Sequence, residues 1–87
     1  MRTRLQPIVT AAQLAALLVN VRKSRKLTQA QLGARLGLSQ KRISELERAP
    51  GTLSVDQLLA ICNQLGLRLD VHLRDDSRAA SNVNVPW

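Results

Sequence analysis

The sequence predicts a mainly α-helical domain of four or five helices, built around a helix-turn-helix and followed by one β-strand. Residues 28–48, TQAQLGARLGLSQKRISELER, contain two helix-like segments separated by a glycine. Three Ser/Thr-x-x-Gln motifs mark helix starts, because the hydroxyl and the glutamine side chain accept hydrogen bonds from otherwise unpaired backbone N–H groups; they begin at Thr10, Thr28 and Ser54. After Gly66, apolar and polar residues alternate strictly, as in a half-buried strand.

The first helix begins after Thr10, which forms a capping box with Gln13. Four aliphatic residues at helical spacing continue its apolar face: Leu14, Leu17, Leu18 and Val21. Four basic residues crowd its C-terminal turns, where cations suit the helix dipole: Arg22, Lys23, Arg25 and Lys26.

The helix-turn-helix has a first helix from Gln29 to about Leu36 and a second from Gln40 to about Arg48. Gly37 suits the left-handed turn that ends a helix, and Ser39 suits the cap of the next one. Five aliphatic residues are spaced to face one core: Leu32, Leu36, Leu38, Ile43 and Leu46. That spacing leaves a hydrogen-bonding outer face on the second helix, as a major-groove reader requires: Gln40, Lys41 and Ser44.

The last helix runs from the Ser54 cap to Gly66, after a turn at Pro50-Gly51. It is expected to be largely buried through five residues: Leu58, Leu59, Ile61, Cys62 and Leu65. The strand over residues 67–74 would place four apolar side chains on one face: Leu67, Leu69, Val71 and Leu73. Because no second strand is visible, the simplest partner is the same strand of another copy, in an antiparallel homodimer. The alternative is an edge extension that frays.

Three regions follow from this pattern: an N-terminal arm (1–9), the DNA-binding domain (10–74) with its dimerisation strand, and a flexible C-terminal tail (75–87). The tail ends in Val85-Pro86-Trp87, a small apolar group on a polar segment. Trp87 suits an anchor in a partner's pocket. The alternative is that these residues have no role.

Positive charge is concentrated around the motif. The chain has 13 Lys and Arg against 6 Asp and Glu, a formal net charge of +7. Residues 22–48 contain eight basic residues and two glutamates, so this window carries six of the seven net charges. A basic surface beside a reading helix is the electrostatic signature of a protein that binds double-stranded DNA.

Composition excludes several other classes of protein. Eighty-seven residues make one small domain, and no segment is long and apolar enough to span a membrane. The N-terminus lacks the apolar region of a signal peptide, and a single cysteine excludes an internal disulfide framework, so a cytoplasmic protein is expected. The absence of Tyr and Phe argues against single-stranded nucleic acid stacked on aromatic rings.

No residue pattern supports catalysis, a metal site or a cofactor. His72 has no second ligand at suitable spacing, and Asp75-Asp76 has no pocket around it. Cys62 lies among leucines and is expected to be a buried, inert thiol.

The stretch LTQAQLGARLGLSQKRISELER resembles the Xre-type helix-turn-helix of phage and bacterial repressors, over about residues 14–66. The helix TLSVDQLLAICNQLG, the following strand LRLDVHLRD and the terminal Trp87 together resemble the HipB-like antitoxins, which partner HipA-like Ser/Thr-kinase toxins. One departure is Gly33, where such motifs usually have Ala. A small residue still lets the two helices approach closely.

The resemblance implies roles for individual residues. Gln40, Lys41 and Ser44 would read base edges, because glutamine can bind adenine N6 and N7 bidentately and lysine can reach guanine. A larger polar and basic set would contact the DNA backbone: Arg25, Lys26, Thr28, Gln29, Ser39, Arg42 and Arg48. Arg22 and Glu47 would form an ion pair that ties the first helix to the reading helix. Trp87 would bind the toxin.

Three hypotheses therefore stand. The first is a homodimeric repressor that binds a palindromic operator, autoregulates its operon and neutralises a HipA-like kinase. The second is a stand-alone Xre-type regulator without a toxin. The third is a protein-interaction adaptor that no longer reads DNA, against which Gln29, Gln40 and Lys41 argue.

Overall fold

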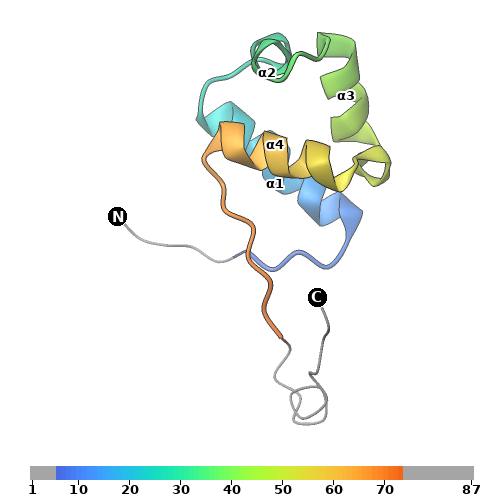
Figure 1. The fold of residues 1–87 in the computed structure, drawn as a ribbon, viewed down its shortest axis with the longest axis vertical. Coiled ribbons are helices and arrows are strands. Elements are labelled where there is room, and N and C mark those ends of the chain that lie inside the picture. The colour runs from blue at the N-terminus through green and yellow to red at the C-terminus, as the bar shows by residue number, and fades with distance from the viewer. Residues whose placement is uncertain (1–5, 74–87) are drawn as a thin grey trace.

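The computed structural model describes residues 6–73. Four α-helices follow in order, with a 3₁₀ turn η1 (Pro50–Thr52) before the last: α1 (Ala11–Ser24), α2 (Gln29–Leu36), α3 (Gln40–Arg48) and α4 (Val55–Leu65). α1 and α4 lie next to each other below the α2–α3 pair (Figure 1). The predicted mainly helical fold with a central helix-turn-helix is confirmed.

The predicted helix starts are confirmed by their hydrogen bonds. At α2, the Gln31 backbone N–H donates to Thr28 Oγ1 at 3.0 Å, and the Thr28 N–H donates to Gln31 Oε1 at 2.8 Å. The same capping box begins α1 at Thr10 and α4 at Ser54. Ser39 caps α3 by accepting from the Arg42 N–H at 3.0 Å. These bonds satisfy donors that every helix leaves unpaired in its first turn.

α2 and α4 end where the sequence predicts, whereas α1 ends earlier than predicted. Gly37 and Gly66 have φ values of +70° and +74°, the left-handed conformation expected after α2 and α4. The last residue of α1 is Ser24, and Arg25 is its C-cap, although the sequence predicts that Arg25 and Lys26 belong to the last turns of this helix. Lys26 has φ +58°, and the following Leu27 N–H donates back to the Arg22 carbonyl at 3.1 Å. Arg25 and Lys26 therefore lie at the end of α1 and beyond it, outside its last helical turn.

Seven buried residues form the core: Leu18, Leu32, Ile43, Leu46, Ile61, Cys62 and Leu65. All five core residues predicted for the helix-turn-helix are buried or partly buried against this cluster. One expectation for α4 is wrong: Leu59 is 47% exposed. Leu58, Ile61, Cys62 and Leu65 share a stripe that faces α1 and α2, and Leu59 falls outside it.

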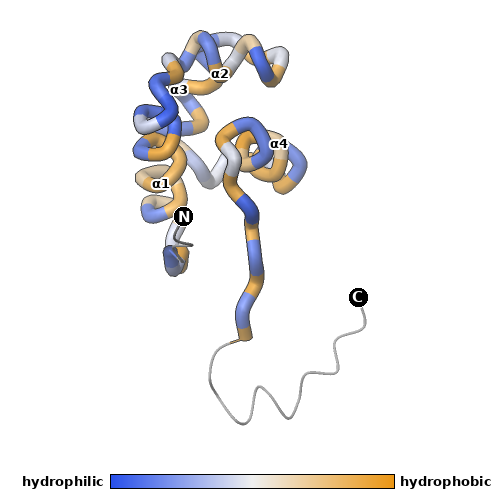
Figure 2. The backbone as a smooth tube through the Cα atoms, turned by 90° about the vertical axis from the view of Figure 1, so that its left-hand side faces the viewer, coloured by the Kyte–Doolittle hydropathy of each residue, from blue (hydrophilic) through white to orange (hydrophobic). Residues whose placement is uncertain are grey.

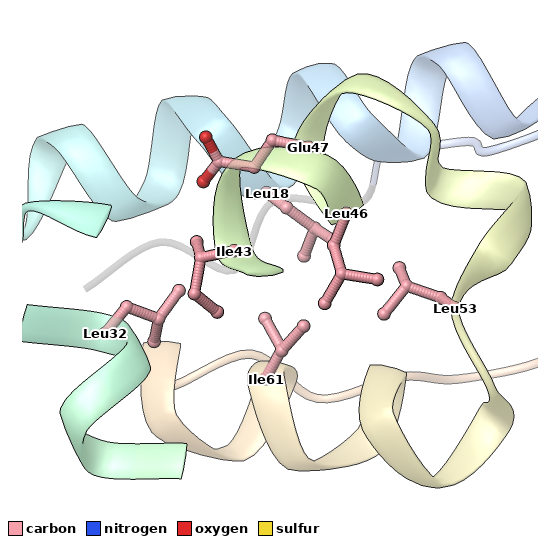
Figure 3. A pocket seen from close by; sticks show the side chains of 7 residues that line it. All are labelled: Leu18, Leu32, Ile43, Leu46, Glu47, Leu53 and Ile61. Atoms are coloured by element: carbon pink, nitrogen blue, oxygen red, sulfur yellow. The ribbon is translucent and has the colours of Figure 1, made fainter. Parts of the chain in front are cut away.

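A small void of about 10 Å³ remains inside the core beneath α3. Figure 3 shows the aliphatic side chains around it, contributed by all four helices and by Leu53. This volume is at the lower limit for a single water molecule, and the only polar side chain that lines it is that of Glu47. The core therefore packs closely beneath the helix-turn-helix and holds α3 on α1, α2 and α4.

The predicted strand is not formed within the described chain, since residues 67–73 have no regular secondary structure. A strand requires a hydrogen-bonded partner, and no other described segment supplies one. The alternation of apolar and polar residues is nevertheless plain along this segment in Figure 2. Leu67 is half-buried, whereas Leu69, Val71 and Leu73 are exposed. Pairing between two copies stays a prediction.

An open groove of about 740 Å³, here called the terminal groove, lies beside these residues. Leu14 and Leu17 of α1 and Leu58 and Cys62 of α4 form its floor, and residues 6–9 and 67–72 form its edges. Both ends of the described chain thus line one largely apolar groove on the opposite side of α1 and α4 from the helix-turn-helix (Figure 1).

Candidate nucleic-acid interface

Gly33 sets the distance between the two helices of the motif. It is buried, and a Cβ built on it would overlap the Leu38 carbonyl oxygen and lie 3.3 Å from Ile43 Cγ1. The Leu38 N–H also donates to the Gly33 carbonyl at 2.8 Å, which fixes the turn against α2. The expectation that a small residue permits a close approach is met, and the structure has no room for the usual Ala.

The three predicted base-reading residues lie in the first half of α3. Gln40 and Lys41 are exposed in its first turn, and Ser44 is half-buried one turn further on. Buried Ile43 and Leu46 anchor the opposite face of the same helix. α3 therefore has one apolar face fixed to the core and one polar face turned outward, which is the geometry that a groove-reading helix needs.

Most of the residues predicted to contact the DNA backbone lie on the helix-turn-helix, and the others lie at the end of α1. The hydroxyls of Thr28 and Ser39 cap α2 and α3, so each places an exposed helix N-terminus beside the reading face. Arg48 ends α3 and is exposed, and Arg42 pairs with Glu45 at 3.5 Å. Each helix N-terminus carries a partial positive charge, which makes this face suitable for binding phosphate oxygens.

Arg25 lies apart from that face. Its guanidinium lies beside Gly66, with Nη2 2.8 Å from the position that a Cβ would occupy there. Gly66 follows the last turn of α4, where unpaired carbonyls favour a cation. Lys26, one residue further along, is exposed. The structure thus brings Thr28, Gln29 and Ser39 to the reading face and leaves Arg25 at the end of α4.

The predicted ion pair between Arg22 and Glu47 is confirmed. Arg22 Nε donates to Glu47 Oε2 at 2.7 Å, and Nη2 donates to Glu47 Oε1 at 3.2 Å. Arg22 Nη1 also donates to the Leu27 carbonyl at 2.7 Å. The two side chains are only 9% and 13% exposed. A two-point pair of this kind fixes geometry as well as charge, and it ties α1 to the end of α3.

Two further hydrogen bonds join this ion pair to the reading face. Gln29 Nε2 donates to Glu47 Oε1 at 2.9 Å, and Gln40 Nε2 donates to Gln29 Oε1 at 2.8 Å. We call Glu47, Gln29 and Gln40 the amide relay. The sequence indicates Gln29 and Gln40 as separate DNA contacts and gives no sign that they bind each other. They are 11 residues apart, on different helices, so no local pattern could reveal the bond.

The sequence also drew attention to four ionisable residues outside this face: Cys62, His72, Asp75 and Asp76. Within residues 6–73 there is no group of three or more His, Cys, Asp or Glu side chains that could hold a metal ion. Cys62 is buried as expected, and desolvation raises the pKa of its thiol above the ordinary value. His72 is exposed. Asp75, Asp76 and Trp87 lie outside the described residues.

None of the described helices has the length and apolarity needed to cross a membrane.

Comparison with known proteins identifies the class. The sequence model of the Helix-turn-helix family (HTH_3) matches residues 18–72, and the chain belongs to this family as an Xre-type protein. The chain is also similar to HipB in several solved structures. In the complex of a HipB variant with an O2 20mer, the HipB chain is 28% identical to this chain, with a TM-score of 0.75 over 83% of this chain and 100% of that chain.

Two further HipB structures are similar to the same extent. The HipB–O4 20mer complex has a TM-score of 0.74, and the HipA–HipB–O2–O3 complex has a TM-score of 0.75. Each is 27% identical and matches 82% of this chain and 100% of the other. No curated protein matches the chain.

Proposed function

We propose that this protein is a sequence-specific repressor that binds double-stranded DNA as a homodimer and acts as the antitoxin of a HipA-like kinase. The observation that carries the DNA-binding part is the outer face of α3, where Gln40 and Lys41 are exposed over a helix fixed to the core. The basic surroundings of the motif support it. The protein would act in the cytoplasm, as a regulator and not as an enzyme.

Base reading would come from Gln40, Lys41 and Ser44. A glutamine amide carries an NH₂ group that can donate to adenine N7 and a carbonyl oxygen that can accept from adenine N6 in the major groove. Lys41 can donate to guanine or to phosphate, and Ser44 can do either. Each good bidentate contact contributes about 1–3 kcal/mol of discrimination against the wrong base.

Positioning on the duplex would come from the DNA backbone. The capped N-termini of α2 and α3 would direct backbone N–H groups toward phosphate oxygens, and Gln29 would add an amide at the start of α2. Arg42 and Arg48 place positive charge along α3, and Lys26 places it at the end of α1. For Arg25 a phosphate contact requires its side chain to leave Gly66.

A homodimer would follow from the antiparallel pairing of residues 67–74 across a two-fold axis. Leu67, Leu69, Val71 and Leu73 would then cover the terminal groove of both copies. Such a dimer sets two reading helices about 34 Å apart, so the operator would be a palindrome.

The toxin partner is proposed from likeness to HipB, which forms a complex with HipA and DNA in one of the similar structures. Trp87 is the proposed anchor for that partner. A stand-alone regulator of the same fold is the alternative. Purification of the tagged protein from its native cell distinguishes the two, because only an antitoxin would retain a kinase of the HipA type.

The first prediction tests DNA reading. Gln40→Ala should weaken binding to the preferred duplex by about 1–3 kcal/mol and leave binding to random duplex nearly unchanged. Lys26→Ala serves as the control, since loss of a phosphate contact weakens both duplexes alike and lowers the salt dependence. Fluorescence anisotropy with both duplexes at two salt concentrations measures the difference. Equal losses for Gln40→Ala on the two duplexes would show that Gln40 reads no base.

A further inference from the structure

We infer that Glu47, whose side chain is only 13% exposed and is not among the proposed DNA contacts, selects the base that Gln40 reads, because it fixes the hydrogen-bond direction of the amide relay. The inference rests on the proposed function and adds a positioning residue to it. Three bonds carry the inference: Arg22 to Glu47, Gln29 to Glu47 and Gln40 to Gln29.

The ion pair between Arg22 and Glu47 sets the direction of the hydrogen bonds in the amide relay. A carboxylate has no proton to donate, so both Glu47 oxygens can only accept. Arg22 occupies Oε2 through Nε at 2.7 Å and reaches Oε1 at 3.2 Å, and the remaining approach to Oε1 is taken by Gln29. The Gln29 atom at that position must therefore be its NH₂ group. The chemistry of Glu47 thus decides which end of the Gln29 amide faces inward.

The second step fixes Gln40. With its NH₂ group on Glu47, Gln29 presents its carbonyl oxygen to Gln40, so Gln40 must donate with its own NH₂. One Gln40 N–H is consumed in this way. The groove then meets one remaining N–H and the carbonyl oxygen of Gln40. That combination matches adenine, which accepts at N7 and donates at N6.

The relay fixes the orientation of an amide that a free glutamine side chain could turn either way. If Gln40 instead accepted from Gln29, both of its N–H groups would be free. Two donors match guanine, which accepts at both N7 and O6. Reversing the relay should therefore move the preference of Gln40 from adenine toward guanine without any change in a residue that touches DNA.

Glu47→Gln is the variant that reverses the relay. Arg22 donates to both oxygens of Glu47, through Nε at 2.7 Å and through Nη2 at 3.2 Å. The shorter bond favours an orientation of the new amide that keeps its oxygen toward Nε, so its NH₂ group takes the place of Oε1. Gln29 then has to turn its oxygen inward and its NH₂ group toward Gln40. Glu45→Gln is the matched control, because Glu45 lies on the same helix, pairs with Arg42 and makes no bond to the relay.

The test uses the full chain and a duplex selected by the wild-type protein from a random library. Gln40→Ala identifies the base pair that depends on Gln40, and four duplexes then vary that pair alone, in one half-site of the operator. We expect the wild type and Glu45→Gln to prefer adenine over guanine by about 5- to 150-fold, the range of one bidentate contact. In Glu47→Gln this ratio should fall at least fivefold and move toward guanine.

A second variant keeps the test decisive if Glu47→Gln does not fold, as circular dichroism would show. Gln29→Met removes the relay and leaves the Arg22–Glu47 pair in place. It should lower the adenine-to-guanine ratio as well, in addition to any uniform loss on all four duplexes. An unchanged ratio in either folded variant overturns the inference. If Gln40→Ala identifies no base pair in the wild type, the proposed reading by Gln40 fails instead, and the two failures are thereby separated.

Discussion

At the residue scale, the arrangement of the site depends mainly on the ion pair between Arg22 and Glu47. Arg22 is 7% exposed, and its guanidinium is shared between Glu47 and the Leu27 carbonyl. Removal of either partner would leave a nearly buried charge uncompensated, which commonly destabilises a protein by about 3–5 kcal/mol. The pair thus holds α1, α3 and the loop before α2 in one arrangement.

A double-mutant cycle measures this coupling. Arg22→Ala, Glu47→Ala and the double variant should give a coupling of about 1–3 kcal/mol in the free energy of unfolding by urea. The Arg42–Glu45 pair is the control, because its side chains are 34% and 41% exposed and its shortest distance is 3.5 Å. Its coupling should stay below about 0.5 kcal/mol. Strict additivity of the Arg22 and Glu47 substitutions would contradict a structural role for their contact.

At the scale of elements, the close approach of α2 to the turn before α3 depends on Gly33. Helix propensity alone favours Gly33→Ala by up to about 1 kcal/mol. The added Cβ would overlap the Leu38 carbonyl oxygen, which belongs to the backbone and cannot rotate away. Overpacking of this kind costs about 1–3 kcal/mol, so the net effect should be destabilising.

Urea denaturation of Gly33→Ala tests which effect is larger. Ala34→Gly is a suitable control, because Ala34 is the next residue of α2 and is exposed. The control should lose about 1 kcal/mol through helix propensity alone. A Gly33→Ala variant that is more stable than the wild type would mean that α2 and the turn are less tightly packed than the structure indicates.

Helix starts are predictable from this sequence because their signals are local. Thr28 accepts from a backbone N–H three residues away, and the same short-range geometry applies at Thr10 and Ser54. The end of α1 is not predictable in this way. Lysine has no intrinsic preference for positive φ, and the turn at Lys26 accompanies the binding of the Leu27 carbonyl by Arg22.

The site shows the same division between local and tertiary effects. Periodicity places Gln40 and Lys41 outside and Ile43 inside, since those positions follow from one helix alone. The bond from Gln40 to Gln29 depends on how α3 crosses α2, and the bond from Gln29 to Glu47 spans 18 residues. Similarly, alternation over residues 67–73 predicts a strand, but a strand also needs a partner, which no other segment within residues 6–73 supplies.

At the scale of the whole molecule, we expect residues 67–74 to form the dimer interface. Val71 is 89% exposed in the single chain. Val71→Pro removes one ladder donor and should convert the dimer to a monomer in sedimentation equilibrium at micromolar concentration. Val71→Ile, which keeps both the N–H and the β-branched side chain, should remain a dimer. If Val71→Pro still sediments as two chains, the interface lies elsewhere.

The C-terminal residues supply a separate prediction for the toxin. Deletion of Pro86-Trp87 should weaken binding to a HipA-like kinase and leave folding and DNA binding nearly unchanged. Trp87 is the only Trp of the chain, so its fluorescence reports directly on its surroundings once the kinase is made free of Trp. A blue shift on complex formation is expected. Emission like that of Trp in water would show that the ring is not bound.

The terminal groove has a consequence for how long the protein survives. Under the proposed dimer, its floor and the exposed Leu69 and Val71 become covered only on association, so part of the apolar burial that stabilises the fold arrives with the second copy. Each tenfold dilution then lowers the stability of the dimer by about 1.4 kcal/mol. At low abundance the protein would unfold more often and meet proteases more often. Its own abundance would thereby set its lifetime, and a fall in synthesis would accelerate its removal.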